Sequence, residues 1–406
     1  MKATDRPFLP YGRQLIEEEE IDAVTSVLRS DYLTTGPIVE AFEEKLASTT
    51  GALHAISTSS GTAALHISAL AIGLKPGDIA IAPSMTFLST VNAALYAGAD
   101  VVFADVDPDT GLMTSEGLEK ALHSAGERAR ALFVVHLNGQ TANMAGLAQV
   151  PTFDRLNVIE DACHALGGMH SDLDGKMVAV GSNAFAQMSI FSFHPVKTVA
   201  MGEGGAITTN DIKLATRLRT LRNIGMTHDP ASFQSRDQAF DSHGSANPWY
   251  YEMAILGLNY RASAIHCAIG MTQLGKLRRF VDKRSALVRR YRERLAKLAP
   301  LIRPLPEVTW CKPAWHLFVV LIDFAAFGCK RADVMRVLYE RGIGTQVHYI
   351  PVHRQPYYRE RYGDLDLPGT DAYYEKVLSL PLFVSMTNDD VDFVVSELCS
   401  VLGEVK

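Results

Sequence analysis

The chain has 406 residues and a net charge of −6 at pH 7, and 47% of its residues are hydrophobic while 21% are charged. These values are typical of a globular protein with two or three domains and a large core. Acidic and basic residues are mixed along the sequence, which excludes the basic patch that a nucleic-acid-binding protein needs.

The cysteines and the apolar runs predict the cellular compartment in which the protein is found. Five widely spaced cysteines form no C-x-x-C pair, so we expect neither a disulfide framework nor a metal site. Residues 1–20 are polar and turn acidic where a signal peptide needs an apolar core. Since no apolar run approaches the ~20 residues of a membrane span, we expect a cytoplasmic protein without a membrane partner.

Apolar segments alternate with helical patterns over the first half of the chain. Residues 52–58 predict a strand, and the helix predicted over residues 59–74 repeats apolar side chains at Leu65, Ala69 and Ile72. The alternation continues, which predicts an α/β domain with a largely parallel sheet covered by helices on both faces. The further predicted strands are residues 78–84, 100–106, 131–137, 156–162, 185–193 and 204–210.

The later part of the chain is predicted to form a second domain. A polar stretch from Thr227 to Pro248 has the length and composition of a functional or a disordered loop. A long helical region, Ala262 to Leu298, then leads to a proline cluster that begins at Pro300 and marks the best domain boundary. We therefore expect a large domain over residues 1–260, a linking helical region over 261–299 and a smaller α/β domain over 300–406.

The first chemical motif follows the strand predicted over residues 52–58. Ser60, Gly61 and Thr62 open the next helix, and small residues there let backbone N–H groups approach an anion. The helix N-terminus also favours negative charge, so these residues are candidates for binding a phosphate. An ordinary helix N-cap is the alternative, because Ser-Gly-Thr forms one as well.

The second motif ends the strand predicted over residues 156–162. Asp161 lies at its carboxyl end, where parallel sheets bind ligands, and His164 follows three residues later. The alternatives are that Asp161 caps a helix and that His164 is a packed turn histidine. Phe87, just past an earlier strand, either stacks on a ligand ring or lies in the core.

Lys197 lies between apolar strand residues and a glycine-rich turn. A lysine in an apolar, tightly turned pocket can have its pKa lowered enough to act as an amine nucleophile, although such a lysine is also often a solvated turn residue. Pyridoxal phosphate (PLP) requires a lysine for its aldehyde, an acid for its pyridine nitrogen and a site for its phosphate. Since the chain combines all three on one α/β sheet, we predict PLP as the cofactor.

Three segments carry a resemblance to a known family. SSGTAALH (residues 59–66), EDACHALGG (160–168) and FSFHPVKTVAMGEGGAITTN (191–210) resemble the signature segments of the DegT/DnrJ/EryC1/StrS sugar-nucleotide aminotransferases, which have PLP fold type I. Residues 257–274 are also similar, and the resemblance extends over nearly the whole chain. It implies a PLP-dependent transaminase that is a homodimer with its active site at the interface. One departure is Asn138, where relatives often have a larger residue.

The resemblance implies a role for each matching position. Lys197, Asp161 and His164 would act in catalysis, with Lys197 bonded to the cofactor aldehyde. Cofactor contacts are further implied for Ser60, Gly61, Thr62, Phe87, Ser192 and, from the neighbouring subunit, Asn259. Sugar-nucleotide contacts are implied for Tyr11, Asp31, Tyr32, Leu33, Thr34, Arg261, Gln346, Val347, His348 and Tyr349.

Within the family, several segments are most similar to the transaminases of the pseudaminic-acid pathway. They are FHPVK, PWYYEM (residues 248–253), QVHYIPVHRQPYY (346–358) and LSLPLF (378–383). This similarity implies transfer of the amino group of L-glutamate to C4 of a UDP-linked 4-keto-6-deoxy-N-acetyl-L-altrosamine-type sugar, with Arg261 and His316 as candidates for the glutamate carboxylate. A 3-keto or dTDP-linked sugar is an alternative substrate. A non-catalytic binding protein on the same fold is an alternative from another class.

Overall fold

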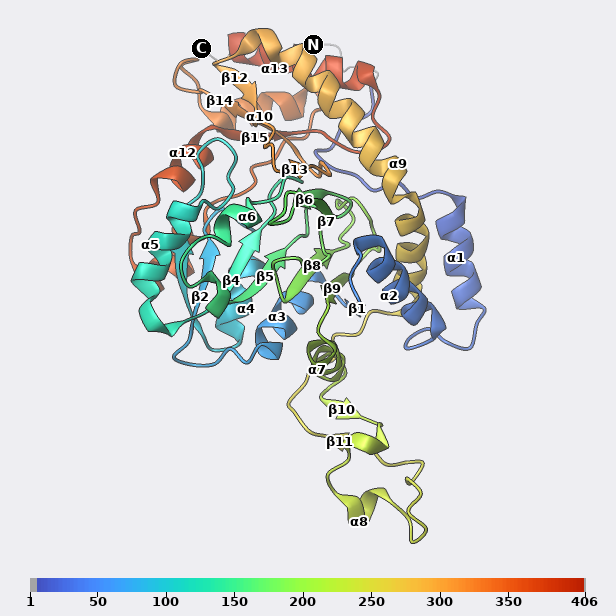
Figure 1. Ribbon diagram of the computed structural model, residues 1–406. Coiled ribbons are helices and arrows are strands. Elements are labelled where there is room, and N and C mark those ends of the chain that lie inside the picture. Colours follow the sequence, from blue (N-terminus) through green and yellow to red (C-terminus); the bar gives the residue numbers. More distant parts are fainter. Residues whose placement is uncertain (1–5, 405–406) are drawn as a thin grey trace.

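A computed structural model describes residues 6–404 of the chain and shows an α/β fold built around one seven-stranded sheet (Figure 1). Its strands are β1 (His54–Thr58), β2 (Ile79–Pro83), β3 (Asp100–Ala104), β4 (Ala129–Val135), β5 (Asn157–Asp161), β8 (Met188–Ser192) and β9 (Gly205–Thr209). They lie in the order β1-β9-β8-β5-β4-β2-β3.

The sheet confirms the predicted, largely parallel arrangement. The strands from β8 across to β3 pair in parallel, whereas β9 runs antiparallel to both of its neighbours. Parallel neighbours require crossover connections, and helices supply them on the faces of the sheet. Because β5 and β8 are parallel neighbours, Asp161 and Ser192 end their strands at the same edge of the sheet.

Helices cover the sheet and form most of the remaining structure. None within residues 6–404 is long and apolar enough to cross a membrane. They are α1 (Glu18–Leu28), α2 (Pro37–Thr50), α3 (Gly61–Ala71), α4 (Leu88–Tyr96), α5 (Ser115–Ala125), α6 (Met144–Leu147), α7 (Ile212–Arg222), α8 (Arg236–Ala239), α9 (Ala264–Leu295), α10 (Arg331–Glu340), α11 (Pro356–Tyr362), α12 (Pro368–Lys376) and α13 (Asn388–Glu404). Short 3₁₀ turns are η1 (Gly126–Arg128), η2 (Phe153–Arg155), η3 (Pro230–Ser232), η4 (Ala296–Leu298) and η5 (Val352–Arg354).

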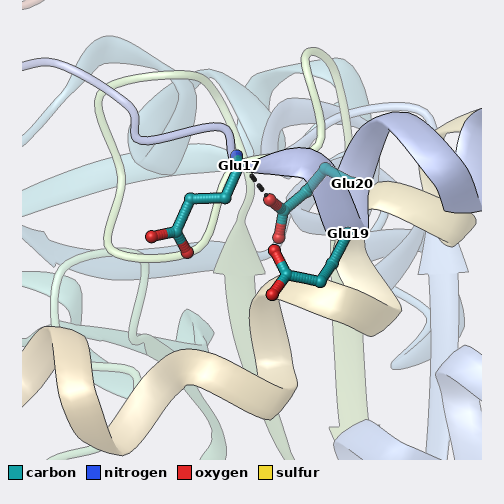
Figure 2. A group of neighbouring side chains, drawn as sticks. All are labelled: Glu17, Glu19 and Glu20. Atoms are coloured by element: carbon teal, nitrogen blue, oxygen red, sulfur yellow. Dashed lines mark hydrogen bonds between the residues drawn. The ribbon is translucent and has the colours of Figure 1, made fainter.

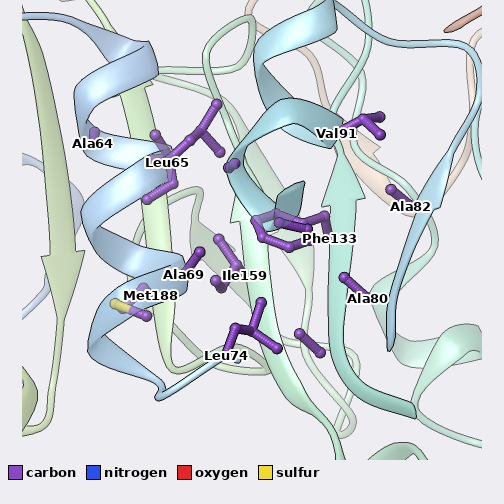
Figure 3. Packing of buried hydrophobic residues seen from close by; sticks show 14 of the residues in the cluster. Ala64, Leu65, Ala69, Leu74, Ala80, Ala82, Val91, Phe133, Ile159 and Met188 are labelled. Carbon is purple, nitrogen blue, oxygen red and sulfur yellow. The ribbon is translucent and has the colours of Figure 1, made fainter. Parts of the chain in front are cut away.

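Helix α3 packs into the main apolar core between the sheet and its neighbouring helices (Figure 3). Leu65 on this helix lies among Phe133 of β4 and Ile159 of β5, and all three side chains are buried. The helix is apolar on nearly all sides, as expected for a helix with packing partners around it. Truncating Phe133 to alanine would cost about 3–5 kcal/mol. The core therefore holds the first turn of α3 firmly against the sheet edge.

The 32-residue helix α9 joins two apolar clusters. It begins where the Ser263 hydroxyl accepts a hydrogen bond from the backbone N–H of His266, at 3.2 Å. Its first half packs through Leu274 beside α2, and its second half packs through Leu287 in the C-terminal part of the chain. That part holds a sheet in the order β12-β14-β15, whose strands are β12 (Ile302–Pro304), β14 (Phe318–Ile322) and β15 (Val377–Leu380). A further sheet pairs β13 (Cys311–Lys312) with β6 (Met169–Ser171), and β6 with β7 (Met177–Ala179).

An arm projects from the body of the molecule beyond α7 (Figure 1). It contains α8 and the paired strands β10 (Met226–Thr227) and β11 (Glu252–Met253), in the region where the sequence predicted a functional or disordered loop. Trp249 on the arm is 72% exposed and Leu256 at its base is 84% exposed. Several large apolar side chains exposed on one projecting segment are typical of an interaction surface.

Ion pairs connect the start of α1 to α9. Glu17, Glu19 and Glu20 turn toward one another (Figure 2), and each has a carboxylate oxygen 2.8–3.0 Å from Lys276 Nζ. Arg279 adds an ion pair with Glu17. Three carboxylates at this spacing could hold a metal ion, but here a lysine ammonium neutralises them. We call these five residues the α1–α9 ion cluster.

Candidate active site

A cavity of about 370 Å³ opens at the carboxyl ends of β4, β5 and β8. This is the edge at which ligands bind to parallel sheets. The N-terminal segment and the C-terminal part of the chain complete its wall, so that residues far apart in the sequence meet here. The predicted site residues that line it are Tyr11, Ser60, Gly61, Thr62, Phe87, Asp161, His164, Ser192, Lys197, His348 and Tyr349, together with His316.

A second cavity of about 960 Å³ lies beside β3, between α5 and the segment that leads into α12. None of the predicted site residues lines it. Its wall includes Lys120, an exposed side chain whose ammonium lies 2.7 Å from the carboxylate of Glu116. The smaller cavity, where the lysine, the acid and the helix start meet, is therefore the candidate active site.

The first turn of α3 forms one end of the candidate active site. Ser60 caps the helix, because its hydroxyl accepts the backbone N–H of Ala63 at 3.1 Å. A side chain at Gly61 would place its Cβ only 2.9 Å from the Cβ of Ser192, so this close approach requires glycine. The backbone N–H groups of Gly61 and Thr62 have no partner within the helix. The hydroxyl of Ser192 lies beside them, which makes this end suitable for an anion.

Asp161 is held as a hydrogen-bond acceptor at the end of β5. Its Oδ2 accepts the hydroxyl hydrogen of Thr90 at 2.6 Å, and its Oδ1 accepts the backbone N–H of Cys163 at 3.2 Å. The side chain is almost completely buried. The sequence motifs did not identify Thr90, because it belongs to α4 and nothing in its local pattern points to Asp161. These two donors fix the orientation of the carboxylate at the strand end.

Lys197 follows β8 in a tight turn, where its backbone N–H donates to the carbonyl of His194 at 2.8 Å. Burial lowers the pKa of Lys197 from its ordinary value, although Cys163 and Asp161 oppose the shift. Among the described residues that line the cavity, Lys197 is the only lysine or arginine. The structure therefore supports the reactive-amine interpretation over that of a solvated turn lysine.

Three histidines and two aromatic residues form the opposite wall. Burial lowers the pKa of His164 and of His316 well below the ordinary value, and their rings lie 4.4 Å apart. Burial also lowers the pKa of His348, to about 3. All three imidazoles are therefore neutral near pH 7. Phe87 is 54% exposed, with its ring 5.9 Å from that of Tyr349, so it faces the cavity instead of the core.

The remaining predicted residues lie outside this cavity. Gln346 pairs with Ser379 on the backbone, and Val347 follows it in the chain. The others gather in a second group near the start of α9, where Thr34 pairs with Ser263 and the Arg261 guanidinium donates to Asn223 Oδ1 at 2.6 Å. Predicted residues in this second group are Asp31, Tyr32, Leu33, Thr34, Asn259 and Arg261. Their roles stay predictions.

Comparisons with known proteins agree with this geometry. The family model of the DegT/DnrJ/EryC1/StrS aminotransferases matches residues 14–399. The structure of Helicobacter pylori PseC, an aminotransferase involved in the biosynthesis of pseudoaminic acid, is 27% identical, with a TM-score of 0.86 over 98% of this chain and 100% of that one. DesI, solved in the presence of its TDP-sugar product, is 31% identical, with a TM-score of 0.84 over 99% of this chain and 95% of that one.

A putative sugar aminotransferase from Streptococcus pneumoniae, solved in its PMP form, is 25% identical, with a TM-score of 0.85 over 98% of each chain. The same protein has also been solved in a PLP form, which is 24% identical over 98% of this chain and 100% of that one, with a TM-score of 0.85. The chain therefore belongs to the DegT/DnrJ/EryC1/StrS aminotransferase family. It is a sugar aminotransferase with the fold of the PLP-dependent transferases, and PLP is its cofactor.

The geometry of the cavity fits this cofactor. The open N–H groups at Gly61 and Thr62 suit a phosphate, because a Cβ at Gly61 would fill the space against Ser192. The buried Asp161 suits a protonated ring nitrogen, since its carboxylate is already held by two donors. In the part of the chain that the structure describes, Lys197 offers the one side-chain amine of the wall for an aldehyde.

Proposed function

We propose that this sugar aminotransferase moves the amino group of L-glutamate to C4 of a UDP-linked 4-keto-6-deoxy-N-acetyl-L-altrosamine-type sugar. The similarity to PseC supports this substrate, as does the segment over residues 346–358. The observation that carries the proposal is the cavity itself, because it joins Lys197, Asp161 and the first turn of α3 to His348 and Tyr349 of that segment.

The proposed residue roles follow the geometry of the cavity. Gly61, Thr62 and Ser192 would hold the phosphate of PLP, and Asp161 would hold its ring nitrogen. Phe87 and His164 would flank the ring from either side. Bound PLP would supply an aldehyde that captures the amino group and a ring that stores the electron pair left when a carbon gives up its proton.

Lys197 would carry the proton in both halves of the reaction. Its Nζ would remove the Cα proton of L-glutamate, and it would later deliver a proton to C4 of the keto sugar. Only a neutral amine can accept a proton. Because burial lowers the pKa of Lys197, more of this amine is neutral near pH 7 than in an exposed lysine.

The active unit would be a homodimer with shared sites. Asn259 is exposed and does not line the cavity of its own chain, although family resemblance gives it a phosphate contact. The arm exposes Trp249 and Tyr251, which a second copy of the chain would cover. The arm and the group of predicted residues near the start of α9 would then complete the partner's site.

Product analysis tests the substrate. The cofactor-loaded enzyme would be incubated with L-glutamate and the UDP-linked 4-keto-6-deoxy sugar, and the products identified by mass and NMR. We expect a 4-amino sugar and an equal amount of 2-oxoglutarate. If glutamate bleaches the cofactor and no amino sugar forms, the transaminase chemistry stands and this sugar is wrong.

The similarity to DesI favours a second candidate, a TDP-linked keto sugar. The residues proposed to hold the cofactor do not distinguish the nucleotide, and only the segment over residues 346–358 favours the UDP-linked sugar. Parallel assays with UDP- and dTDP-linked 4-keto sugars decide between the candidates through the ratio of kcat/KM. A ratio above about tenfold for the dTDP sugar would replace the UDP proposal with this one.

Mixing of subunits tests the shared site. Lys197→Ala and Asn259→Ala chains would each be inactive or weak, because each lacks one part of every site. In a mixed dimer, one site receives both intact residues. We therefore expect up to about a quarter of the wild-type activity after unfolding and refolding the two variants together. Failure to recover any activity, with dimers present, would contradict shared sites.

A further inference from the structure

The hydrogen bonds around His164 fix the position of its ring proton. The backbone N–H of Asn138 points at His164 Nδ1, at 3.3 Å. A backbone N–H can only donate, so Nδ1 must be the unprotonated acceptor. Burial lowers the pKa of His164 well below its ordinary value, so the ring carries a single proton. That proton is therefore on Nε2.

The proton on Nε2 decides the orientation of the Tyr349 hydroxyl. His164 Nε2 lies 3.0 Å from Tyr349 Oη. Because Nε2 is the donor in this contact, Oη is the acceptor, and its own hydrogen is not used here. Tyr349 Oη has no further hydrogen-bond partner among the described residues, and the side chain lines the cavity. The free O–H of Tyr349 is thus available to a ligand.

The surrounding structure holds this orientation in place. Asn138 has a positive φ of 62°, a conformation that asparagine tolerates better than most residues. Its side chain donates to the hydroxyl of Tyr373 at 3.0 Å, and its carbonyl accepts the backbone N–H of His316 at 3.1 Å. Burial raises the pKa of Tyr349, so the hydroxyl keeps its proton near neutral pH. The chain Asn138–His164–Tyr349 therefore ends in a fixed donor.

We propose that Tyr349 donates a hydrogen bond from Oη to an anionic oxygen in the cavity, the carboxylate of the amino donor, and that His164 is the positioning residue that holds it as a donor. The proposal rests on the proposed function. Among the described residues of one chain that line the cavity there is no arginine, Lys197 is committed to proton transfer, and burial keeps His164, His316 and His348 neutral. Neutral O–H and N–H donors of this wall are therefore available to a carboxylate, in addition to Arg261 where a second subunit completes the site. The phenolate oxygen of the cofactor is the other anionic oxygen that this hydroxyl could reach.

Tyr349→Phe tests the donor, because it removes only the hydroxyl. Purified, PLP-loaded enzyme would be titrated with L-glutamate while the visible absorbance of the bound PLP is recorded. The half-bleaching concentration is the glutamate concentration at which half of this absorbance has been lost. We expect that concentration to rise at least about tenfold, since hydrogen bonds to charged groups are among the stronger ones. A changed spectrum before glutamate is added would instead assign the bond to the cofactor phenolate. An unaltered spectrum with an unaltered half-bleaching concentration would overturn the proposal.

Tyr358→Phe is the matched control. Its hydroxyl donates to Asn92 Oδ1 at 2.5 Å, and it lies outside the candidate active site. This variant loses a buried tyrosine hydroxyl in the same way, so it reports the general cost of that loss. We expect its spectrum and its half-bleaching concentration to match the wild type.

His164→Gln tests the positioning role. If His164 acts on the amino donor through Tyr349, the His164→Gln/Tyr349→Phe double variant should need no more glutamate than the worse single variant. Independent, additive increases would overturn the positioning role. If glutamate does not bleach the wild-type enzyme at all, the proposed function itself is wrong. If glutamate bleaches the wild type and Tyr349→Phe equally well, only the role of Tyr349 is wrong.

Discussion

The α1–α9 ion cluster and the candidate active site both gather titratable side chains, but the pKa shifts in the two regions have different causes. In the α1–α9 ion cluster, opposite charges meet: hydrogen bonds from Arg279 and Lys276 lower the pKa of Glu17 to about 2. Burial lowers the pKa of Lys276, but the glutamates outweigh it and raise the pKa overall. In the candidate active site, burial without a carboxylate partner lowers the pKa of His348 to about 3.

The two regions show that ionisable residues can serve either to attach helices to one another or to take part in chemistry. Pairing keeps a group charged over a wide pH range, which suits an attachment between helices. Burial beside few opposite charges removes the charge, and a neutral amine or imidazole is what proton transfer and hydrogen bonding require. Lys197 and Lys276 are thus the same residue type with opposite pKa shifts.

Lys197→Ala should have the largest effect, because no other lysine among residues 6–404 lines the cavity to carry the proton. We expect the overall rate to fall at least about 10³-fold, while the protein still folds, since the side chain is only partly buried. Turnover of amino sugar and the visible spectrum of the purified variant measure this. A variant that retains the wild-type spectrum would show that another lysine bonds to the cofactor.

Thr90→Val should have a smaller effect within the same site. The change keeps the shape of the side chain and removes the hydrogen bond to Asp161 Oδ2. Asp161, in its proposed role, would then hold the ring nitrogen less firmly, and we expect kcat to fall about tenfold, less than in Asp161→Ala. Steady-state kinetics and the dissociation constant for PLP check this. Equal losses in Thr90→Val and Asp161→Ala would mean that Thr90 acts in another way.

The buried histidine His348 should make stability depend on pH. Its pKa is about 3 in the folded chain and near 6.5 when unfolded, so between these values the unfolded chain binds more protons. Stability is therefore lost as the pH falls below 6.5, by about 2 kcal/mol between pH 7 and 5 for this one group.

His348→Gln should remove that contribution and give a shallower pH dependence, measured by urea unfolding of the cofactor-free protein at pH 7 and 5. His123→Gln is the control, since it removes a histidine from the exposed surface of α5 and leaves the buried His348 in place. Parallel pH dependences in the wild type and His348→Gln would contradict the pKa shift.

Lys276→Met should have the smallest effect, and only on stability. The change leaves Glu17, Glu19 and Glu20 without their shared partner, so they repel one another more. Glu19 is largely exposed, whereas Glu17 is partly buried and Glu20 is buried, so both screening and burial shape the effect. We expect the midpoint of thermal unfolding to fall by about 2 °C, and by less at high salt. Turnover should be unchanged. A loss of activity larger than the loss of stability would mean that the two regions are coupled.

The sequence indicated much of the chemistry because its motifs follow strand ends. Asp161 and Ser192 end neighbouring parallel strands, and Gly61 opens the helix after β1, so their convergence follows from the predicted α/β pattern. Thr90 and Asn138 could not be identified in this way. Their contacts to Asp161 and His164 join elements whose relative placement depends on packing.

What the amino-acid sequence by itself determined is the α/β class, the family and the cofactor, because local periodicity and short motifs encode all three. Only the tertiary structure decided which predicted residues meet. Tyr349 lies 185 residues from His164 in the chain, yet the two share a hydrogen bond. Such a contact depends on how the C-terminal part packs against the sheet, and so does the loss of charge on the cavity histidines, since burial is a property of the whole fold.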